Sequence, residues 1–498
     1  MLEFFNSKVF VAGIAIFLNF SCTPKKHNYN ILFISVDDLN DWVGFMDGNH
    51  QAITPHMDKL AKNGLVFDNA YCPAPLCSPS RTAIMTGVRP SSSGIYMNSP
   101  YFRISPALKE ILTIPQYLST YGDYYTAARG KIFHQPMGKY ADSVSWDNFQ
   151  NISGNIMGDH PRKLKNILVN EIPYSNKKQA LLDWGPLDIK FEETSDAKTA
   201  KWAANELNKD HNSPFFIACG IFRPHLPWYL PKEFFNKFPL EKIIIPDVAS
   251  DDLNDIPAKG LEMTNSLDSE GDYQRITTYD KQKEAVQAYL ASTNYADQCV
   301  GIILDALNNS KYKDNTIVIL WGDHGWHLGE KLSYRKSKLW EESTRVPFIV
   351  LVPGITSPGS YSKRIVNLID IYPTLLELCN LPKNNKNEGR SIVPLLSNPD
   401  VQWPYPTVTT MGYLNHTVRS EDWRYIQYED GEEELYDHKN DPLELTNLAN
   451  IKDFDIIKDE LKNWMPVENK RIRMKEIGTK RSGKWKKSGR KKVVTGLY

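Results

Sequence analysis

Long apolar runs that end abruptly in polar residues are the dominant pattern of this chain. The clearest three span residues 30–36, 214–222 and 316–322. Unbroken apolar runs of this length are typical of parallel strands that are buried on both faces, and such strands bring ligand-binding side chains to their carboxyl ends. The pattern therefore predicts an α/β protein with a site at one edge of a parallel sheet.

Helical and alternating patterns complete the expected architecture. Residues 281–308 predict a long amphipathic scaffold helix, and residues 114–121 predict a shorter helix that Gly122 ends. From about Pro382 the chain changes to short alternating segments such as residues 423–428. We therefore expect a large mixed, mostly parallel sheet flanked by helices, followed by a smaller C-terminal subdomain with an antiparallel sheet.

Two of the predicted strands end in residues that suit a metal ion. Asp37 and Asp38 follow the first strand, and Asp323 and His324 follow the last. Adjacent carboxylates repel each other unless a cation or hydrogen-bond donors neutralise them, which favours a metal site over the alternative of a solvated turn. Three carboxylates favour a hard cation such as Ca²⁺ or Mg²⁺, although imidazole is a softer ligand than Ca²⁺ normally selects.

A helix N-terminus is predicted near Cys77. A proline lies two residues after Cys77, and Arg81 lies four residues after it, about one helical turn away. Gly87 is a residue type that commonly ends a helix. Unpaired backbone N–H groups, the helix dipole and Arg81 would together form an anion site around residue 77. A buried structural cysteine is the alternative, but it does not account for the Pro-Ser-Arg sequence or the glycine stop.

Composition adds fewer constraints. The chain has 498 residues with 59 basic and 59 acidic side chains, so its bulk charge favours no class of partner. Its six cysteines lack the close, repeated spacing of a zinc site or a disulfide framework.

The N-terminus looks like an export signal. An apolar run over residues 9–20 follows Lys8 and is too short to span a bilayer as a helix. Residues 18–22 resemble a bacterial lipoprotein cleavage site, so Cys22 is a candidate lipid anchor, with an ordinary signal peptide as the alternative. We expect an exported protein, periplasmic or anchored to the outer membrane of a Gram-negative bacterium, which meets little nucleic acid.

The segment from Cys77 to Gly87 resembles the signature of the type I sulfatases, Cys-x-Pro-Ser-Arg-x-x-x-(Leu/Met)-Thr-Gly, at every position. These enzymes belong to the alkaline phosphatase superfamily, so the resemblance implies that fold. It also implies that a formylglycine-generating enzyme converts Cys77 to formylglycine, whose hydrated aldehyde is the family's nucleophile. The match is specific because the modifying enzyme itself reads this short segment.

Further motifs of the family can be placed on this chain. Its Gly-Lys-x-x-His motif matches Lys131 and His134, and its Lys-Pro-His-x-Pro motif resembles the segment that contains His225. Counting back from Thr-Arg-Val-Pro places the family's lysine at Lys336, with Lys338 as the neighbouring alternative. The resemblance implies two overlapping sets, a catalytic one and a metal-binding one: Cys77, Arg81, Lys131, His134, His225 and Lys336; and Asp37, Asp38, Cys77, Asp323 and His324. It implies Ca²⁺ ahead of Mg²⁺ or Mn²⁺.

The resemblance implies hydrolysis of sulfate esters on a sulfated carbohydrate, either a glycosaminoglycan or a marine polysaccharide such as ulvan. The Asp-His pair is similar to that of iduronate-2-sulfatase-like members, which favours a sulfated uronate as substrate. Arg103 and Lys338 are the candidates to bind the sugar carboxylate. Two alternatives stay open: a phosphonate or phosphodiester hydrolase of the same superfamily, and a non-catalytic surface lipoprotein that binds sulfated glycans.

Four segments are expected along the chain. Residues 1–22 form the signal peptide, residues 23–381 the catalytic domain, and residues 382–466 the C-terminal subdomain. Residues 467–498 form a tail rich in Lys and Arg, which could contact an anionic polysaccharide.

Overall fold

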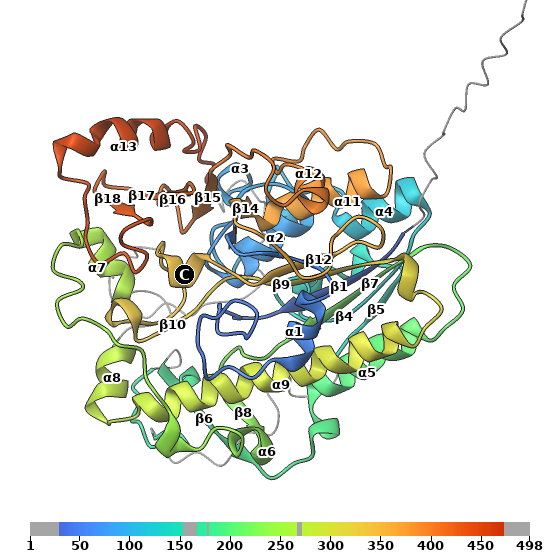
Figure 1. Cartoon of the computed structure of the whole chain (residues 1–498), viewed down its shortest axis with the longest axis horizontal. Helices are drawn as coiled ribbons and strands as arrows, with labels where there is room; N and C mark the ends of the chain where they lie inside the picture. The colour runs from blue at the N-terminus through green and yellow to red at the C-terminus, as the bar shows by residue number, and fades with distance from the viewer. Residues whose placement is uncertain (1–28, 153–166, 177–178, 266–270, 473–498) are drawn as a thin grey trace, which may run out of the picture.

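The computed structural model describes residues 29–152, 167–176, 179–265 and 271–472. A central sheet separates two layers of helices, and a second, smaller sheet lies beside it (Figure 1). The proposed signal peptide, Cys22 and most of the basic tail lie outside the described residues. Within the described ranges, no helix is both long and apolar enough to cross a membrane.

The central sheet has eight strands and is mixed but mostly parallel, as the apolar runs predict. The three runs become its central strands, and the two reversed pairings both involve the same strand, β12. The order across the sheet is β13 (Ser360–Ser362), β2 (Leu65–Phe67), β12 (Phe348–Leu351), β9 (Thr316–Gly322), β1 (Asn30–Val36), β7 (Phe215–Ile221), β4 (Tyr125–Gly130) and β5 (Asn148–Gln150).

The register of these strands decides where the polar residues meet. Val36, the last residue of β1, pairs with Gly322 at the end of β9 and with Ile221 at the end of β7. Gly130 at the end of β4 pairs with Gly220 of β7. Four parallel strands therefore stop at the same level, so the residues that follow them share one edge of the sheet.

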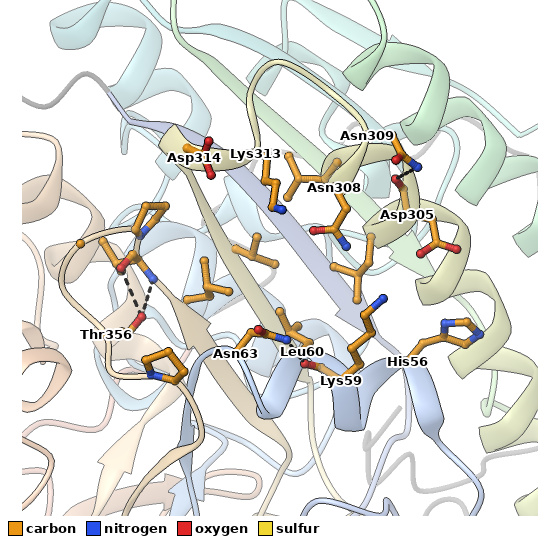
Figure 2. A pocket seen from close by; sticks show the side chains of 18 residues that line it. His56, Lys59, Leu60, Asn63, Asp305, Asn308, Asn309, Lys313, Asp314 and Thr356 are labelled. Carbon is orange, nitrogen blue, oxygen red and sulfur yellow. Dashed lines mark hydrogen bonds between the residues drawn. The ribbon is translucent and has the colours of Figure 1, made fainter.

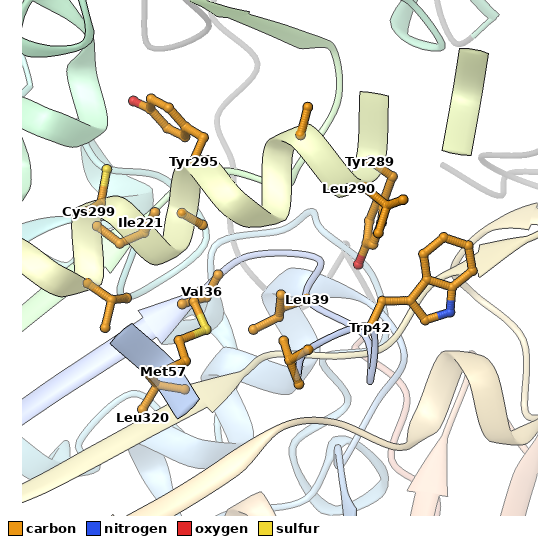
Figure 3. Close-up of a cluster of buried hydrophobic side chains, with 14 of the residues drawn as sticks. Val36, Leu39, Trp42, Met57, Ile221, Tyr289, Leu290, Tyr295, Cys299 and Leu320 are labelled. Carbon is orange, nitrogen blue, oxygen red and sulfur yellow. The ribbon is translucent and has the colours of Figure 1, made fainter. Parts of the chain in front are cut away.

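One face of the sheet packs against α9 (Gln282–Asn308), the predicted scaffold helix, together with α1 (Pro55–Ala61) and α5 (Ser195–Leu207). Alternate residues of β1 point to this side. Figure 3 shows Val36 and Leu39 against Met57, with Tyr289 and Tyr295 projecting from α9. The hydroxyl of Tyr289 donates to the backbone carbonyl of Asp38 (2.8 Å), so this core layer also holds the end of β1 in place.

The other face is covered by α2 (Cys77–Thr86), α4 (Ile114–Gly122) and α11 (Ile371–Leu378) (Figure 1). All ten residues of α2 are buried, including its polar ones. A buried polar helix needs partners for its side chains. Those partners are supplied by the strand ends.

The C-terminal sheet has four antiparallel strands, as the alternating pattern predicts. They are β15 (Thr407–Thr410), β16 (His416–Arg419), β17 (Trp423–Gln427) and β18 (Glu433–Asp437), with α13 (Asp455–Lys462) packed beside them. The backbone N–H of Thr410 donates to the carbonyl of Pro73 (3.0 Å), just before α2. The small sheet therefore touches the segment that leads into Cys77.

The remaining elements are short or lie at the periphery. They are β3 (Ala70–Tyr71), α3 (Pro90–Ser93), β6 (Trp184–Leu187), β8 (Trp228–Pro231), α6 (Lys232–Phe235), α7 (Ala258–Asn265), α8 (Asp272–Thr278), β10 (His327–Leu328), β11 (Tyr334–Arg335), α10 (Glu341–Thr344), β14 (Val366–Asn367) and α12 (Val393–Ser397).

Candidate active site

Cys77 is the first residue of α2, at the helix N-terminus that the sequence predicts. Leu76 before it is extended, and Gly87 ends the helix with φ of 73°, a conformation that glycine adopts without steric cost. The side chain of Asn98 accepts from the backbone N–H of Ser78 (3.0 Å) and thereby satisfies one unpaired donor of the first turn. Cys77 is buried, with 1% of its surface exposed.

Arg81 links α2 to the strand ends. Its guanidinium donates to Asp323 (Nε–Oδ2, 2.7 Å) and to Asp37 (Nη2–Oδ1, 3.1 Å), and none of the three side chains is exposed. A third contact reaches the backbone carbonyl of Lys131. Arg81 therefore holds the carboxylates of β1 and β9 in place, whereas the sequence suggested that it would face an open anion site.

Two lysines complete a ring of charges around the thiol. Lys336 donates to Asp38 (Nζ–Oδ1, 2.6 Å) and lies 3.0 Å from the sulfur of Cys77. Lys131 forms an ion pair with Asp37. The neighbouring Lys338 instead donates to the carbonyl of Tyr334 (2.6 Å). The structure thus brings Lys336, and not Lys338, to residue 77.

The pKa values of the acids reflect this uneven distribution of cations. Burial alone would raise the pKa of Asp37, but Lys131 and Arg81 hold it well below its ordinary value. Burial raises the pKa of Asp323 to about 6, although Arg81 and His324 act against this. Burial would lower the pKa of His324, yet the carboxylate of Asp323 raises it to about 9.

Four residues converge in a way that suits a metal ion. Ligand atoms of Asp37, Asp38, Cys77 and His324 all lie within 4.8 Å of one another, and all four side chains are buried. The Oδ2 atom of Asp38 is buried and has no hydrogen-bond partner among the described residues. An unpaired buried carboxylate oxygen is costly, and a cation would satisfy it. The donor set therefore fits a divalent cation.

Asp323 lies at the border of this group. Its Oδ2 atom is 3.6 Å from Nε2 of His324, and its Oδ1 atom accepts from the backbone N–H of Asp38 (3.0 Å). Both oxygens therefore already have donors, Oδ2 from Arg81 and Oδ1 from Asp38, whereas Asp38 has one free oxygen.

The two other predicted histidines lie at different distances from the thiol. Burial lowers the pKa of His134, and the Cys77 thiol is near enough to act against this shift. The buried Nδ1 atom of His134 has no hydrogen-bond partner among the described residues. His225 is half-buried, and its Nδ1 atom lies 2.6 Å from the carbonyl of Leu226. His225 is near enough to Asp37 to influence its pKa, but no direct contact of His225 with Cys77 is found in the described part of the chain.

Three residues of the site escaped the sequence reasoning. Asn98 lies in a loop without pattern, and Trp321 and Trp326 support the cations, since Arg81 lies 5.4 Å from the Trp321 ring and Lys336 lies 5.5 Å from the Trp326 ring. A tryptophan at the end of an otherwise aliphatic strand is the one signal that could have pointed to Trp321.

The two candidates for the sugar carboxylate are placed elsewhere. Arg103 pairs with Asp142 through two nitrogens, at 2.7 Å each. Lys338 is almost fully buried and contacts the Tyr334 carbonyl. Both side chains already have partners, so the structure does not support either as a substrate contact.

A large groove lies away from these residues. It has a volume of about 820 Å³ and lies between α1, the C-terminal end of α9 and the loop after β12. Figure 2 shows Lys59, Lys313 and Asn308 around it. None of its lining residues belongs to the cluster around Cys77. We therefore identify the candidate active site by its side chains and not by the volume of this groove.

Comparison with protein families gives two matches. The family model described as Sulfatase matches residues 29–381. The model described as N-sulphoglucosamine sulphohydrolase, C-terminal, matches residues 322–471. Together they span the central sheet and the C-terminal sheet.

Curated relatives agree with the family models. A protein named Sulfatase from Formosa agariphila is 38% identical over 449 residues, which cover 88% of this chain and 87% of the relative. The human Iduronate 2-sulfatase is 31% identical over 392 residues, which cover 71% of this chain and 69% of the relative.

Among solved structures, the phosphonate monoester hydrolase of Agrobacterium radiobacter superimposes with a TM-score of 0.72. The match covers 87% of this chain and 94% of that chain, at 19% identity. At this identity the likeness establishes a shared fold and nothing about the substrate.

Proposed function

The chain belongs to the sulfatase family and hydrolyses sulfate esters, and we propose that it acts on a sulfated carbohydrate with residue 77 as formylglycine and a divalent cation, Ca²⁺, beside it. One observation carries this proposal. The sulfur of Cys77 lies 3.0 Å from Lys336 and 3.3 Å from His324, at the N-terminus of a helix and among buried carboxylates.

The charges around residue 77 suit the demands of the reaction. Sulfate ester hydrolysis must stabilise negative charge on the non-bridging oxygens and protonate an alkoxide leaving group. Burial alone would raise the pKa of the Cys77 thiol, but Lys131 and Lys336 hold it well below its ordinary value, and the first turn of α2 adds backbone donors. Arg81 holds Asp37 and Asp323 and so positions the acids rather than the substrate.

We propose the following bond changes at residue 77. One hydroxyl of the hydrated aldehyde gives its proton to Asp323, and its oxygen bonds to sulfur as the S–O bond to the sugar breaks. The sugar oxygen takes a proton from Lys336 or His225. The second hydroxyl then loses its proton to His134, the C=O bond forms again, and the C–O bond to sulfate breaks. Water adds to the aldehyde and restores the starting state. His134 and residue 77 influence each other's pKa, and the buried Nδ1 atom of His134 has no hydrogen-bond partner among the described residues, which supports its assignment to the second step.

The metal would be held by Asp37, Asp38, His324 and residue 77, with Asp323 adjacent. A bound divalent cation supplies positive charge that stabilises oxyanions. The free Oδ2 atom of Asp38 supports this assignment. The carboxylate-rich donor set favours Ca²⁺ over softer ions, with Mg²⁺ and Mn²⁺ as the alternatives.

We propose a sulfated uronate as the substrate unit, because the human relative is named Iduronate 2-sulfatase. The test is turnover of a panel of defined oligosaccharides that carry sulfate on uronate, galactose or rhamnose units. Preference for neutral sugars would contradict the uronate assignment and leave the carbohydrate assignment intact. Greater turnover of a phosphodiester or a phosphonate monoester would favour the alternative reaction, which the shared fold permits.

The nucleophile has its own test. Peptide mass analysis of protein made together with a formylglycine-generating enzyme should show the aldehyde at residue 77. Cys77→Ala should keep its thermal stability and lose turnover, because the defect is chemical. Full activity with an unmodified thiol would contradict the proposed nucleophile.

We further propose export of the protein and lipidation of Cys22, on the sequence of residues 8–22 alone. Metabolic labelling with a fatty acid analogue tests this. Label that is retained in a Cys22→Ala variant would contradict it.

A further inference from the structure

We propose a second binding site, at Arg89, Ser91 and Arg390, that holds another sulfated unit of the same saccharide chain. The site is a pocket of about 390 Å³ between α3 and residues 464–468. The inference rests on the proposed carbohydrate substrate, but its residues are separate from those around Cys77.

The two arginines of this pocket lack ion-pair partners in the described part of the chain. Arg390 stacks on the ring of Tyr405 (4.1 Å) and lies 5.6 Å from the ring of Trp464, which fixes the direction of its guanidinium. Both arginines influence the buried Asp370, but Asp370 accepts from the backbone N–H of Arg390 and forms no ion pair with either side chain. Two guanidinium groups that form no ion pair within the described residues suit an anion with several oxygens.

A buried hydroxyl gives independent support. The side chain of Ser91 lines the pocket, is 1% exposed, and its oxygen has no hydrogen-bond partner among the described residues. A buried polar group without a partner is unfavourable, so a ligand oxygen or hydroxyl there would remove a cost.

The acidic residues of the pocket distinguish a sugar from a bare sulfate ion. Glu388 accepts from the backbone N–H of Arg89 (2.6 Å), and Glu468 lies 3.7 Å from Lys470. A carboxylate beside the arginines would repel a free dianion but would accept hydrogen bonds from sugar hydroxyls. The ring of Trp464 adds a flat face on which a sugar could pack. These features favour a sulfated saccharide over inorganic sulfate.

A series of contacts connects the pocket with the active site. The carbonyl of Ser91 accepts from the backbone N–H of Lys470 (2.8 Å), and the next residue, Arg471, stacks on Tyr413 at 3.8 Å. Tyr413 packs edge-on against Tyr96 at 6.0 Å, two residues before Asn98.

Asn98 in turn contacts the first turn of α2, next to Cys77. The ten residues of α2 correspond to about 15 Å of helix. Cys77 begins this helix and Arg89 of the pocket follows its C-terminal end, so the two sites are separated by a distance on the order of the helix length, which a saccharide of several units spans.

Binding is tested first, in Cys77→Ala protein so that the ligand is not consumed. Calorimetry would compare a sulfated oligosaccharide of several units, the same oligosaccharide without sulfate, and inorganic sulfate. Arg390→Ala should weaken binding of the sulfated oligosaccharide by about tenfold, the loss of roughly one charge-assisted hydrogen bond. Arg390→Lys should recover part of this loss. Lys59→Ala, which removes one charge from the groove in Figure 2, is the matched control and should bind like the parent.

Turnover separates this site from the catalytic one. In enzyme with intact residue 77, Arg390→Ala and Arg89→Ala should leave kcat/KM for a small aryl sulfate unchanged and raise KM for the long oligosaccharide. Equal binding by Arg390→Ala and the parent would overturn the proposal, as would tight binding of inorganic sulfate that the oligosaccharide does not displace. Absence of turnover of every sulfated oligosaccharide by the parent would instead contradict the proposed function, and the calorimetry would still decide on the pocket.

Discussion

Asp37 and Asp38 are neighbours in the sequence, yet they have different partners. Asp37 is bound by both Arg81 and Lys131, whereas Asp38 has Lys336 and one oxygen without a partner among the described residues. The side chains of Arg81 and Lys131 therefore neutralise most of the charge of Asp37, even when no metal is bound. Asp38 depends more strongly on a bound cation.

Asp38→Asn should therefore abolish metal retention. It removes the charge of the carboxylate whose second oxygen is free, so affinity for the cation should fall by at least about 100-fold, with turnover falling in parallel. Elemental analysis after dialysis against a chelator measures the bound metal directly. Asp297→Asn, a buried acid that binds the start of α1, is the control and should retain metal. Equal metal content in Asp38→Asn and the parent would contradict this assignment.

The position of a site residue could be predicted where a continuous stretch of the sequence identifies the strand that it follows. Asp37, Asp38, Asp323 and His324 follow apolar runs, and those runs alone identify the strands. The destination of Arg81 was not predictable, because it depends on the separation between α2 and two strand ends that lie far apart in the sequence. The partner of Arg103, Asp142, lies 39 positions away and was not predictable for the same reason. Lys338 binds the carbonyl of Tyr334, four residues before it, and neither side chain is supported as a sugar ligand by its contacts.

At the level of elements, the ends of β7 and β4 pack unusually closely. Gly220 of β7 faces the backbone of Lys131, and a Cβ atom at position 220 would lie 2.4 Å from three backbone atoms of Lys131. The lysine follows β4 directly and forms an ion pair with Asp37. The missing side chain at position 220 therefore helps to set the position of Lys131.

Gly220→Ala should reduce turnover strongly and lower the free energy of unfolding only moderately. The added methyl group must push the end of β4 away, which costs about 1–3 kcal/mol of unfolding free energy and displaces Lys131 from Asp37. Urea unfolding and aryl sulfate kinetics measure the two effects separately. Turnover close to that of the parent would show that Lys131 tolerates the displacement.

For the whole molecule, a buried ion network joins the C-terminal sheet to the catalytic domain. Glu341 of α10 binds Arg424 of β17, which also binds Glu444, and His438 lies 2.8 Å from Glu444. The acids and His438 have the spacing of a metal site, but arginine occupies the position between them. The sequence predicted the small sheet but not this contact, because Glu341 lies 83 positions before Arg424 and 103 before Glu444.

Acid should weaken this contact. Burial alone would raise the pKa of Glu341, but Arg419 and Arg424 hold it below its ordinary value of 4.5, and Arg424 with His438 does the same for Glu444. A carboxylate whose pKa is lower in the folded state stabilises the fold fully above 4.5, and this stabilisation is lost as the pH falls through the folded pKa.

Glu341→Gln should therefore lose about 3–5 kcal/mol of unfolding free energy near neutral pH, because it leaves Arg424 without part of its counter-charge. The difference from the parent should shrink as the pH falls below 4.5. Urea unfolding at a series of pH values measures it. A difference that stays constant down to acidic pH would show that the charge of Glu341 is not the source of the stability.

We expect the basic tail to act at the longest range. Residues 473–498 are rich in Lys and Arg and contain one acid, Glu476. A dense positive charge accelerates the approach of a polyanion, and salt screens this effect. Truncation after Ile472 should leave thermal stability and aryl sulfate turnover unchanged, because it keeps both sheets and every residue of the cluster around Cys77. Association with a sulfated polysaccharide should slow by about tenfold at low salt, and the difference should vanish near 1 M salt.

A tail of the same length with Gln at every Lys and Arg is the control for chain length. If this tail associates as fast as the natural one, the charge of residues 473–498 has no part in substrate capture.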